Sequence, residues 1–514
     1  MITKSLFVNF TSSPHLAWRS LHDKKWVYAQ ILEAKYWSMD WFAIWEEVEQ
    51  AVLKLLDTRE IVKITTDWLD FSNWHASYHE KTMQALDDKP AVVYQPWFVH
   101  DGLFCKCDVL ALNEEWTYDL LEIKAKNSVR KKTKDAPLLD DMSADISFQS
   151  YVLTHVLWDK FSGKCFFMHL NKEFVRDGDV DYAELITSDN VSEELMAYAQ
   201  IELMIDSIKK LSDMTKEQLD TTYPYSGEDH LTYFGTPQEK WSVRNIPRIW
   251  RKLPELYNAW VKMIDDITDE QVISLLTNKK DEPTVQSRYV QLRKQWENTV
   301  LDVEAVQEQL WELSYPLYFY DYETVSVPVP VFQKSSPRQQ VVVQYSCHKI
   351  DADGTITHTE AVINNGENDN LRIIDQLITD LNEWKDWTHI VRYKWFENSR
   401  NKELAELYPP YKEALEAINA KTFDLMEVFS KLNYFDNRFA GSSSIKKVLP
   451  VLTDISYSDL EVSNGGVASW LLWKLAKWEI EATEEEKIIT DLLEYCKQDT
   501  WAMVRIWEEV KKKL

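Results

Sequence analysis

Apolar residues in the first part of the chain recur at the spacing of a helix with one buried face. In the stretch WFAIWEEVEQAVLKLLDTRE, a period of about 3.6 residues places Trp45, Val48 and Val52 on one side, together with Leu55 or Leu56. Residues 1–60 are therefore expected to be helical.

The period changes between residues 91 and 126, where β-branched and aromatic residues form short runs. Turn-forming pairs, Asp101-Gly102 and Asn113-Glu114, separate these runs. This pattern predicts a meander of strands. Helical spacing then returns in DISFQSYVLTHVLW, which begins at residue 145.

A second pattern of strands and helices begins near Tyr315. We predict, in order, the strand LYFYDYETV, the strand QVVVQYSCHKI, a hairpin or turn at DADGT, the helix NLRIIDQLITDLNEW, the strand HIVRYKW and helices to the C-terminus. Strands that alternate with helices indicate a mixed or parallel sheet with helices packed on it. Residues 176–312, between the two patterns, are polar, acidic and mostly helical in spacing.

The length of 514 residues exceeds what one hydrophobic core usually serves, so we expect two or three domains. With 45% hydrophobic residues, 28% charged residues and only 10 glycines, the composition is that of a folded protein and excludes a disordered or fibrous one. We predict an α/β fold class with three regions: an α/β domain at 1–175, a mostly helical connector at 176–312 and a second α/β domain at 313–514.

Neither a membrane span nor a secretory signal is predicted. No stretch reaches 18 uncharged apolar residues, and the start MITKSLFVNFTSSPHLAW lacks a basic region followed by a long apolar one. We therefore expect a cytoplasmic protein with no membrane partner. The five cysteines lack CxxC spacing, which argues against a disulfide framework or a zinc ribbon; they are Cys105, Cys107, Cys165, Cys347 and Cys496.

The net charge of -26 opposes binding to nucleic acid, because affinity for phosphate comes from lysine and arginine. Local segments are nevertheless basic, namely KAKNSVRKKTK, RNIPRIWRK and RYKWFENSRNK. Basic runs are usually solvated faces, but two of these adjoin acidic candidates for chemistry. We therefore predict contacts to nucleic acid from Lys126, Arg130, Lys131, Lys132, Arg392, Lys394 and Arg400.

Two carboxylates stand one residue apart at the end of the apolar run LYFYDYETV. Alternate side chains of a strand share a face, so Asp321 and Glu323 are expected to point one way and Tyr322 the other. One interpretation is a strand end at the surface, where both acids are solvated. The other is a bound divalent cation, because paired carboxylates can hold ions that activate water in phosphodiester hydrolysis.

Further acids downstream bear on this choice. WFENSRNKELAEL places Glu397 at a strand-to-helix junction, and LLEYCKQDTWAMV places Tyr495 and Asp499 four residues apart on one helix face. By themselves, such a tyrosine and acid are more often a core residue and a solvated one.

A second candidate site lies in the predicted meander. Glu122 and Lys124 of LLEIKAK share one strand face, and Asp108 is available from the neighbouring strand of a hairpin. The acid pair can hold Mg²⁺, while Lys124 can polarise the attacking water and stabilise charge on phosphate. The alternative is an ordinary surface Glu-Lys pair, which contributes less than about 1 kcal/mol.

The arrangement between residues 41 and 158 resembles the PD-(D/E)xK nuclease core of RecB-like type. This resemblance implies a restriction-endonuclease-like α/β core in which Asp108 and Glu122 bind metal, Lys124 is catalytic and Gln149 faces the site. An acid on an upstream helix, Glu47 or Glu49, would complete the metal site.

Two positions depart from that family. Members with an iron-sulfur cluster have a cysteine near the start and three after the core, whereas this chain has Ser13 and lacks the later cysteines, so we expect no iron-sulfur cluster. The usual Gln-x-x-x-Tyr is also altered, because Leu153 lies four residues after Gln149 and Tyr151 lies between them.

The order D-x-E, an acid after the third strand, then Tyr-x-x-x-Asp is similar to the DEDD (DnaQ-like) 3′-5′ exonucleases of the tyrosine subtype, which have an RNase H-like fold. The resemblance implies two Mg²⁺ or Mn²⁺ ions and a role for Tyr495 in orienting the water; the implied metal ligands are Asp321, Glu323, Glu397 and Asp499. Glu397 departs from the pattern, since the family usually has Asp there. Asp424 resembles a position that is often structural.

YDYETVSVPVP, VQYSCH, GSSSIKKVLP, NGGVAS and YCKQDT resemble an uncharacterised bacterial family in which a RecB-like domain precedes a DnaQ-like domain. Our leading hypothesis is a metal-dependent nuclease with two sites, acting on DNA rather than RNA. The alternative is a nucleic-acid-binding or complex-forming protein in which one or both nuclease cores are inactive platforms. A third reading, an aromatic-rich interaction protein, would have to explain the 23 tryptophans.

Overall fold

The computed structural model describes residues 1–23, 25, 39–56, 60–65, 74–131, 136–225, 241–278, 282–295, 298–311, 313–381, 388–391, 394–457, 460–462 and 464–514. The chain forms two compact units. Unit 1 comprises residues 1–235 with the short segments 327–330 and 336–338, and unit 2 comprises 236–326, 331–335 and 339–514. The division lies inside the predicted connector, whose elements therefore belong to both units; the three-region boundaries stay a prediction.

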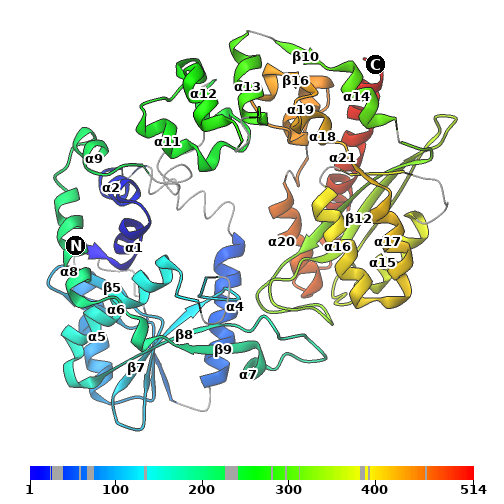
Figure 1. Ribbon diagram of the computed structural model, residues 1–514. Coiled ribbons are helices and arrows are strands. Elements are labelled where there is room, and N and C mark those ends of the chain that lie inside the picture. Colours follow the sequence, from blue (N-terminus) through cyan, green and yellow to red (C-terminus); the bar gives the residue numbers. More distant parts are fainter. Residues whose placement is uncertain are drawn as a thin grey trace. The chain divides into compact units, whose positions relative to one another are not determined.

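Unit 1 contains a mixed sheet of six strands in the order β2-β3-β6-β7-β8-β9 (Figure 1). Neighbours are antiparallel except for the pairs β2 with β3 and β7 with β8, which are parallel. Its strands are β2 (Ile61–Lys63), β3 (Val92–Tyr94), β6 (Val109–Leu112), β7 (Tyr118–Lys124), β8 (Phe161–Leu170) and β9 (Ile186–Asn190). A smaller sheet has the order β1-β5-β4, with β1 (Ile2–Thr3), β4 (Trp97–His100) and β5 (Leu103–Lys106).

The strands predicted between residues 91 and 126 are present as β3 to β7, but they do not form a single meander, because β4 and β5 pair in the smaller sheet and β3 pairs with β6. The first segment is mainly helical as predicted, but it opens with β1, which pairs in parallel with β5. The helices of unit 1 are α1 (Lys4–Ser12), α2 (Pro14–His22), α4 (Met39–Leu56), α5 (Trp74–Asp87), α6 (Asp140–Leu157), α7 (Tyr182–Leu185), α8 (Tyr198–Leu211) and α9 (Lys216–Thr222). In α4, Val48 and Val52 are buried and Leu56 is half-buried, whereas Leu55 is exposed, so the buried face continues through Leu56.

Alternate side chains of strand β7 pack into two separate hydrophobic cores of unit 1. Leu120 of β7 packs in the core that contains apolar residues of α1, α5 and α6, while Leu121 and Ile123 pack in the core that contains Val48 and Val52 of α4. Side chains two residues apart on a strand share a face, so Glu122 and Lys124 lie on the same face as Leu120. Their backbone positions therefore direct both polar side chains toward α6.

Unit 2 contains a mixed sheet of five strands in the order β13-β12-β11-β14-β15. β12 is antiparallel to both of its neighbours, and β14 is parallel to both of its neighbours. The strands are β11 (Leu317–Val325), β12 (Val341–Ile350), β13 (Ile356–Val362), β14 (Thr388–Val391) and β15 (Thr422–Asp424); β10 (Thr299–Leu301) and β16 (Tyr434–Asp436) form a separate antiparallel pair.

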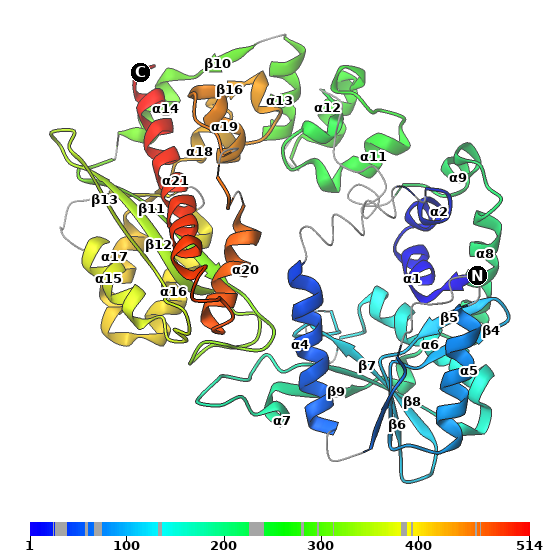
Figure 2. The same cartoon turned by 180° about the vertical axis from the view of Figure 1, so that it is seen from behind.

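Helices cover both faces of this sheet. Figures 1 and 2 show α15, α16 and α17 on one face and α20 and α21 on the other. The helices of unit 2 are α11 (Leu253–Asn258), α12 (Asp269–Leu276), α13 (Val285–Lys294), α14 (Val303–Leu310), α15 (Leu371–Leu381), α16 (Lys394–Leu407), α17 (Lys412–Ala420), α18 (Glu427–Ser430), α19 (Ile445–Leu452), α20 (Gly465–Ala476) and α21 (Glu485–Lys511). Short 3₁₀ helices lie in unit 1 at Trp158–Lys160 and Ser192–Glu194, and in unit 2 at Val243–Asn245, Ile249–Arg251, Ile264–Asp266, Pro409–Tyr411 and Asn437–Phe439. The predicted α/β fold class is confirmed.

In unit 2, one predicted strand is too long and one strand was not predicted. The strand predicted at HIVRYKW ends at Val391, where its pairing with β15 also ends, and Lys394 already belongs to α16. The edge strand β13 was missed because its sequence, ITHTEAV, is mostly polar and only pairing with β12 makes it a strand. No helix within the described ranges is long and apolar enough to cross a membrane.

Candidate metal sites

Three carboxylates from two elements meet in unit 2. Strand β11 contributes Asp321 and Glu323, and helix α21 contributes Asp499. All three side chains are buried, and the oxygen atoms that they offer lie within 4.8 Å of one another. We call Asp321, Glu323 and Asp499 the acidic triad.

Strand geometry positions the first two members of the acidic triad. Tyr322, between them, points to the opposite face, where its hydroxyl donates a 2.8 Å hydrogen bond to Asn401 Oδ1 of α16. The predicted alternation across this strand is thus seen in the structure. The third member, Asp499, lies far along the chain and reaches the strand because α21 packs against β11 and β12.

The three buried carboxylates create a strongly negative potential, which affects the pKa of the neighbouring Cys496 thiol. Burial raises the pKa of the Cys496 thiol well above its ordinary value, and Glu323, Asp321 and Asp499 raise it further. The thiol therefore stays protonated and lies 3.9 Å from the Asp321 carbonyl oxygen. Carboxylate oxygens are the ligands that Mg²⁺ and Mn²⁺ prefer, so the acidic triad fits a divalent cation.

A cavity of about 740 Å³ adjoins the acidic triad. Glu323, Glu397 and Tyr495 all line it. Glu397 is buried in the first turn of α16 and lies in the cavity wall, outside the triad. The Tyr495 hydroxyl and Glu323 Oε2 both approach Gly465 at the start of α20, since a Cβ atom there would lie 3.8 Å and 3.9 Å from them.

Two residues of this site were not predicted. The Tyr457 hydroxyl donates a 2.6 Å hydrogen bond to Asp499 Oδ1. Lys446 lines the cavity, with its ammonium group 5.0 Å from the centre of the Tyr457 ring and 5.4 Å from that of Tyr495. Neither residue stands at a motif spacing from the acids, so no local signal in the sequence identifies them.

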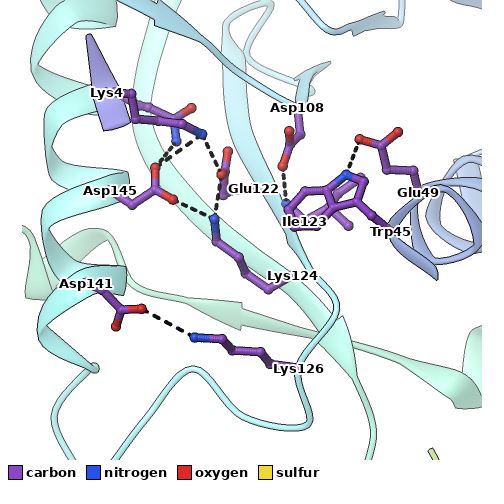
Figure 3. A network of polar contacts seen from close by, with 11 residues as sticks. Lys4, Trp45, Glu49, Asp108, Glu122, Ile123, Lys124, Lys126, Asp141 and Asp145 are labelled. Carbon is purple, nitrogen blue, oxygen red and sulfur yellow. Dashed lines mark hydrogen bonds and ion pairs between the residues drawn. The ribbon is translucent and has the colours of Figure 1, made fainter. Parts of the chain in front are cut away.

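The second candidate site is a polar network on β7 and α6 of unit 1, shown in Figure 3. Lys124 Nζ donates to Glu122 Oε1 at 2.8 Å and to Asp145 Oδ2 at 2.6 Å. Gln149, which the RecB-like resemblance places facing the site, donates from Nε2 to Asp145 Oδ1 at 2.8 Å. Asp145 was not predicted, although it lies one helical turn before Gln149 and thus on the same face.

Lys4, at the start of α1, is the other unpredicted member of this network. Its ammonium group donates to Glu122 Oε1 at 2.9 Å and lies 3.3 Å from Asp145 Oδ1. Burial alone lowers the pKa of both Lys4 and Lys124, but Asp145 and Glu122 outweigh it and raise both pKa values above the ordinary one. In turn, burial raises the pKa of Asp145, and the two lysines bring it below its ordinary range. Both ammonium groups therefore stay charged.

Asp108 completes this network from the loop before β6. Its Oδ2 accepts a 2.8 Å hydrogen bond from the Ile123 backbone N–H. Burial and the neighbouring Glu122 raise the pKa of Asp108 to about 8, against the lowering effect of Lys4 and Lys124. A carboxyl group with such a pKa stays partly protonated at neutral pH unless a further cation is bound.

Glu49, one of the two acids of α4 expected to complete the metal site, already accepts hydrogen bonds from neighbouring side chains. Glu49 is buried and accepts hydrogen bonds from Trp45 Nε1 at 2.6 Å and from the Tyr94 hydroxyl. Glu47 is half-buried on the same helix. Ser13, at the position where the iron-sulfur members have cysteine, caps α2 by accepting a hydrogen bond from the Leu16 N–H at 3.0 Å. Tyr151, which lies between Gln149 and Leu153 in the altered Gln-x-x-x-Tyr pattern, donates a 3.3 Å hydrogen bond to Glu202.

Most of the predicted contacts to nucleic acid are paired with acids. Lys126 lies 3.3 Å from Asp141, Lys131 lies 2.8 Å from Asp140, and Arg130 donates to both carboxylate oxygens of Glu194 at 2.7 Å and 2.6 Å. In unit 2, Arg400 lies 2.5 Å from Glu403, whereas the Lys394 side chain is exposed. Lys132 and Arg392 lie outside the described residues. A phosphate would have to replace these acids, which lowers the gain from each contact.

The two units thus define an α/β protein with a buried acidic triad in one unit and a carboxylate-lysine network in the other. Residues 318–444 match the model of a family described as a domain of unknown function, DUF2779. The matched stretch includes Asp321, Glu323 and Glu397, while Tyr495 and Asp499 lie beyond it.

Similar chains occur among curated proteins. An uncharacterized protein of Mycoplasma genitalium is 28% identical over 207 residues, which cover 37% of this chain and 31% of that protein. Its homolog in Mycoplasma pneumoniae is 30% identical over 215 residues, with 37% and 31% covered. An uncharacterized protein of Ureaplasma parvum is 26% identical over 235 residues, with 42% and 34% covered. The chain spans about a third of the length of these relatives.

Among solved structures, one chain comes from a study of the 3′-end-specific recognition of a histone mRNA stem-loop by a 3′-exonuclease. It shares 12% sequence identity with this chain at a TM-score of 0.21 and covers 46% of this chain and 88% of its own length.

Proposed function

We propose that this protein is a metal-dependent phosphodiesterase that hydrolyses nucleic acid, with DNA as the favoured substrate. The acidic triad is the observation that carries this function, because three buried carboxylates within 4.8 Å of one another need a cation to offset their charge. The adjoining cavity of about 740 Å³ offers room for a substrate group beside them. Its wall also carries the ammonium group of Lys446, which attracts phosphate.

In unit 2, Asp321, Glu323 and Asp499 would hold the metal, and Glu397 is proposed as the fourth acid from the cavity wall. Bound Mg²⁺ or Mn²⁺ would supply an activated water and offset the charge that develops on the phosphate. The Tyr495 hydroxyl and the Glu323 carboxylate both approach Gly465 in the cavity wall. Tyr495 is therefore proposed to orient the water. With the DnaQ-like resemblance, these roles predict removal of nucleotides from the 3′ end.

In unit 1, Asp108 and Glu122 are proposed as metal ligands of a separate RecB-like site. Lys124 would stabilise the phosphate, since Glu122 and Asp145 hold its ammonium group in one place. Gln149 acts on Asp145 and is therefore proposed as a positioning residue. Preorganised charge of this kind needs no rearrangement during the reaction.

Cleavage of 5′-labelled single-stranded DNA, duplex DNA and RNA with Mg²⁺ or Mn²⁺ tests this function. We expect Asp321→Asn to abolish a ladder that grows from the 3′ end, and Glu122→Gln to abolish a different cut. Cleavage that is unchanged in the double variant would contradict both assignments. A chain that binds DNA without cutting any substrate would instead favour the platform alternative.

A further inference from the structure

Lys4 is the charged residue of the unit 1 network that the proposed function leaves without a role. Its ammonium group lies 2.9 Å from Glu122 Oε1, and the Lys124 ammonium group lies 2.8 Å from the same oxygen (Figure 3). One oxygen of a proposed metal ligand therefore receives two ammonium groups. The other oxygen, Glu122 Oε2, is buried and has no hydrogen-bond partner within the described part of the chain.

The local structure does not account for a lysine at this position. Lys4 is the first residue of α1, where the helix carries a partial positive charge and a cation is unfavourable. The backbone around it is held in place, because Ile2 and Thr3 pair with β5 and the Thr3 hydroxyl oxygen accepts a 3.1 Å hydrogen bond from the Leu6 N–H. The compensation for the charge of Lys4 comes from Glu122 and Asp145 of other elements.

The charges of this network limit how many metal ions it can hold. When Asp108 is ionised, the three carboxylates Asp108, Glu122 and Asp145 and the two ammonium groups leave one negative charge. One divalent ion would change that to one positive charge, whereas two ions would leave three positive charges in a largely buried place. A second ion would also have to displace an ammonium group from Glu122 Oε1.

We propose that the Lys4 ammonium group takes the place of a second divalent cation, so that the unit 1 site binds one metal ion and Lys4 offers the second positive charge to the phosphate. This role rests on the proposed function of unit 1. The Lys4 side chain is 23% exposed and that of Lys124 is 9% exposed, so Lys4 is the more accessible of the two. An ammonium group has three donors; that of Lys4 donates one hydrogen bond to Glu122 and forms an ion pair with Asp145.

The number of bound ions tests this role without measuring activity. The full chain carrying Asp321→Asn and Asp499→Asn, which weakens the acidic triad, serves as the parent and is titrated with Mn²⁺ by calorimetry. Glu122→Gln in the parent identifies the ions that belong to unit 1. We expect one Glu122-dependent ion in the parent and two after Lys4→Met, while Lys4→Arg, which keeps the charge, stays at one.

Lys160→Met is the matched control, because Lys160 forms an ion pair with Asp87 at 3.2 Å on the surface of the same unit. It should leave the number of ions at one. Two ions in the parent, or one ion after Lys4→Met in a chain with an unchanged thermal unfolding curve, would overturn the role of Lys4. If Lys4→Met does not fold, the parent and Lys4→Arg still test the proposed role of Lys4, since two Glu122-dependent ions in either chain would overturn that role.

Cleavage of DNA by the same variants separates this role from a blocking one. At Mn²⁺ concentrations that fill only one Glu122-dependent site, we expect Lys4→Met to lower Glu122-dependent cleavage at least about tenfold, because the charge of Lys4 is lost and no second ion replaces it. Faster cleavage after Lys4→Met would show that Lys4 obstructs the site and would overturn the inference. If neither the parent nor Lys4→Met binds a Glu122-dependent ion, the proposed metal site of unit 1 is wrong. If the parent and Lys4→Met each bind one ion and cleave DNA equally, only the proposed role of Lys4 is wrong.

Discussion

Tyr457 donates a 2.6 Å hydrogen bond to Asp499 Oδ1 across 42 residues of sequence. Tyr457 has only 8% of its surface exposed, and Asp499 is fully buried. The hydrogen bond fixes one oxygen of a proposed metal ligand and so orients the whole carboxylate. Groups that orient metal ligands in this way commonly matter nearly as much as the ligands themselves.

Replacing Tyr457 by Phe should weaken Mn²⁺ binding to the acidic triad by about tenfold, because Asp499 loses its orienting donor. Calorimetric titration of the variant measures this change. Tyr345→Phe is the matched control, since the Tyr345 hydroxyl also donates to a carboxylate, that of Asp380, but on β12 and α15. Equal Mn²⁺ affinity in the wild type and Tyr457→Phe would show that Asp499 does not depend on this hydrogen bond.

Divalent metal should stabilise unit 2 through the acidic triad. We expect Mn²⁺ at about one hundred times its dissociation constant to raise the free energy of unfolding by about 2.7 kcal/mol, as binding to the folded state alone requires. Asp321→Asn should remove this gain and should also raise the melting temperature in a chelator, since one buried negative charge is gone. Thermal unfolding with Mn²⁺ and with chelator measures both effects. An equal Mn²⁺-dependent rise in Asp321→Asn would remove Asp321 from the metal site.

Asp145 should be essential for the geometry of the unit 1 network. Asp145→Asn leaves the buried Lys4 and Lys124 with less compensation, which should destabilise the chain by about 3 kcal/mol. It should also lower Glu122-dependent cleavage about one hundredfold, because Lys124 is no longer held in place. Chemical denaturation and the DNA cleavage assay measure these effects.

Asp141→Asn is the control on the same helix. Its partner Lys126 is 46% exposed and lies 3.3 Å away, so this surface pair should contribute less than about 1 kcal/mol. If the two substitutions destabilise the chain equally, the network around Asp145 has no special role.

Two adjacent histidines should make unit 2 sensitive to acid. The rings of His348 and His358 lie 4.4 Å apart, and His348 Nδ1 lies 2.8 Å from Thr500 Oγ1. Burial, His358 and Lys497 lower the pKa of His348 to about 3, and burial and Lys497 lower that of His358 to about 4. Both rings therefore stay neutral in the folded chain at pH 5, whereas the unfolded chain takes up protons there.

Because the folded pKa values lie below the unfolded ones, their stabilisation is complete above about pH 6.5 and is lost as the pH falls toward 4. We expect His348 to cost about 2 kcal/mol of unfolding free energy between pH 7 and pH 5. His348→Gln should reduce this loss, and denaturant titrations at both pH values measure it. An identical pH dependence in His348→Gln would place the acid sensitivity elsewhere.

Local periodicity was enough to predict several pairs of residues that share a face. The alternation of a strand places Asp321 with Glu323 and Glu122 with Lys124, while one helical turn places Tyr495 with Asp499. The same rules predict the strands between residues 91 and 126. In each case the residues are neighbours along the backbone, so their relative directions follow from bond geometry without any packing.

Polar pairing was much harder to predict. The sequence predicts phosphate contacts from Lys126, Arg130 and Lys131 but gives no sign of their partners within the chain. In the structure, Lys126 and Lys131 pair with acids at the start of α6, and Arg130 pairs with Glu194. Charge along the sequence does not show which acids face a lysine, because the partner comes from another element.

The α/β class, most of the elements and the candidate acids could be predicted from the sequence, since they depend on short-range spacing. The structure was needed to show that Asp499 meets Asp321 and Glu323, that Tyr457 donates to Asp499, and that Lys4 meets Glu122. Each of these contacts joins side chains on different elements. Their distances depend on how helices and sheets pack, and no local pattern encodes that packing.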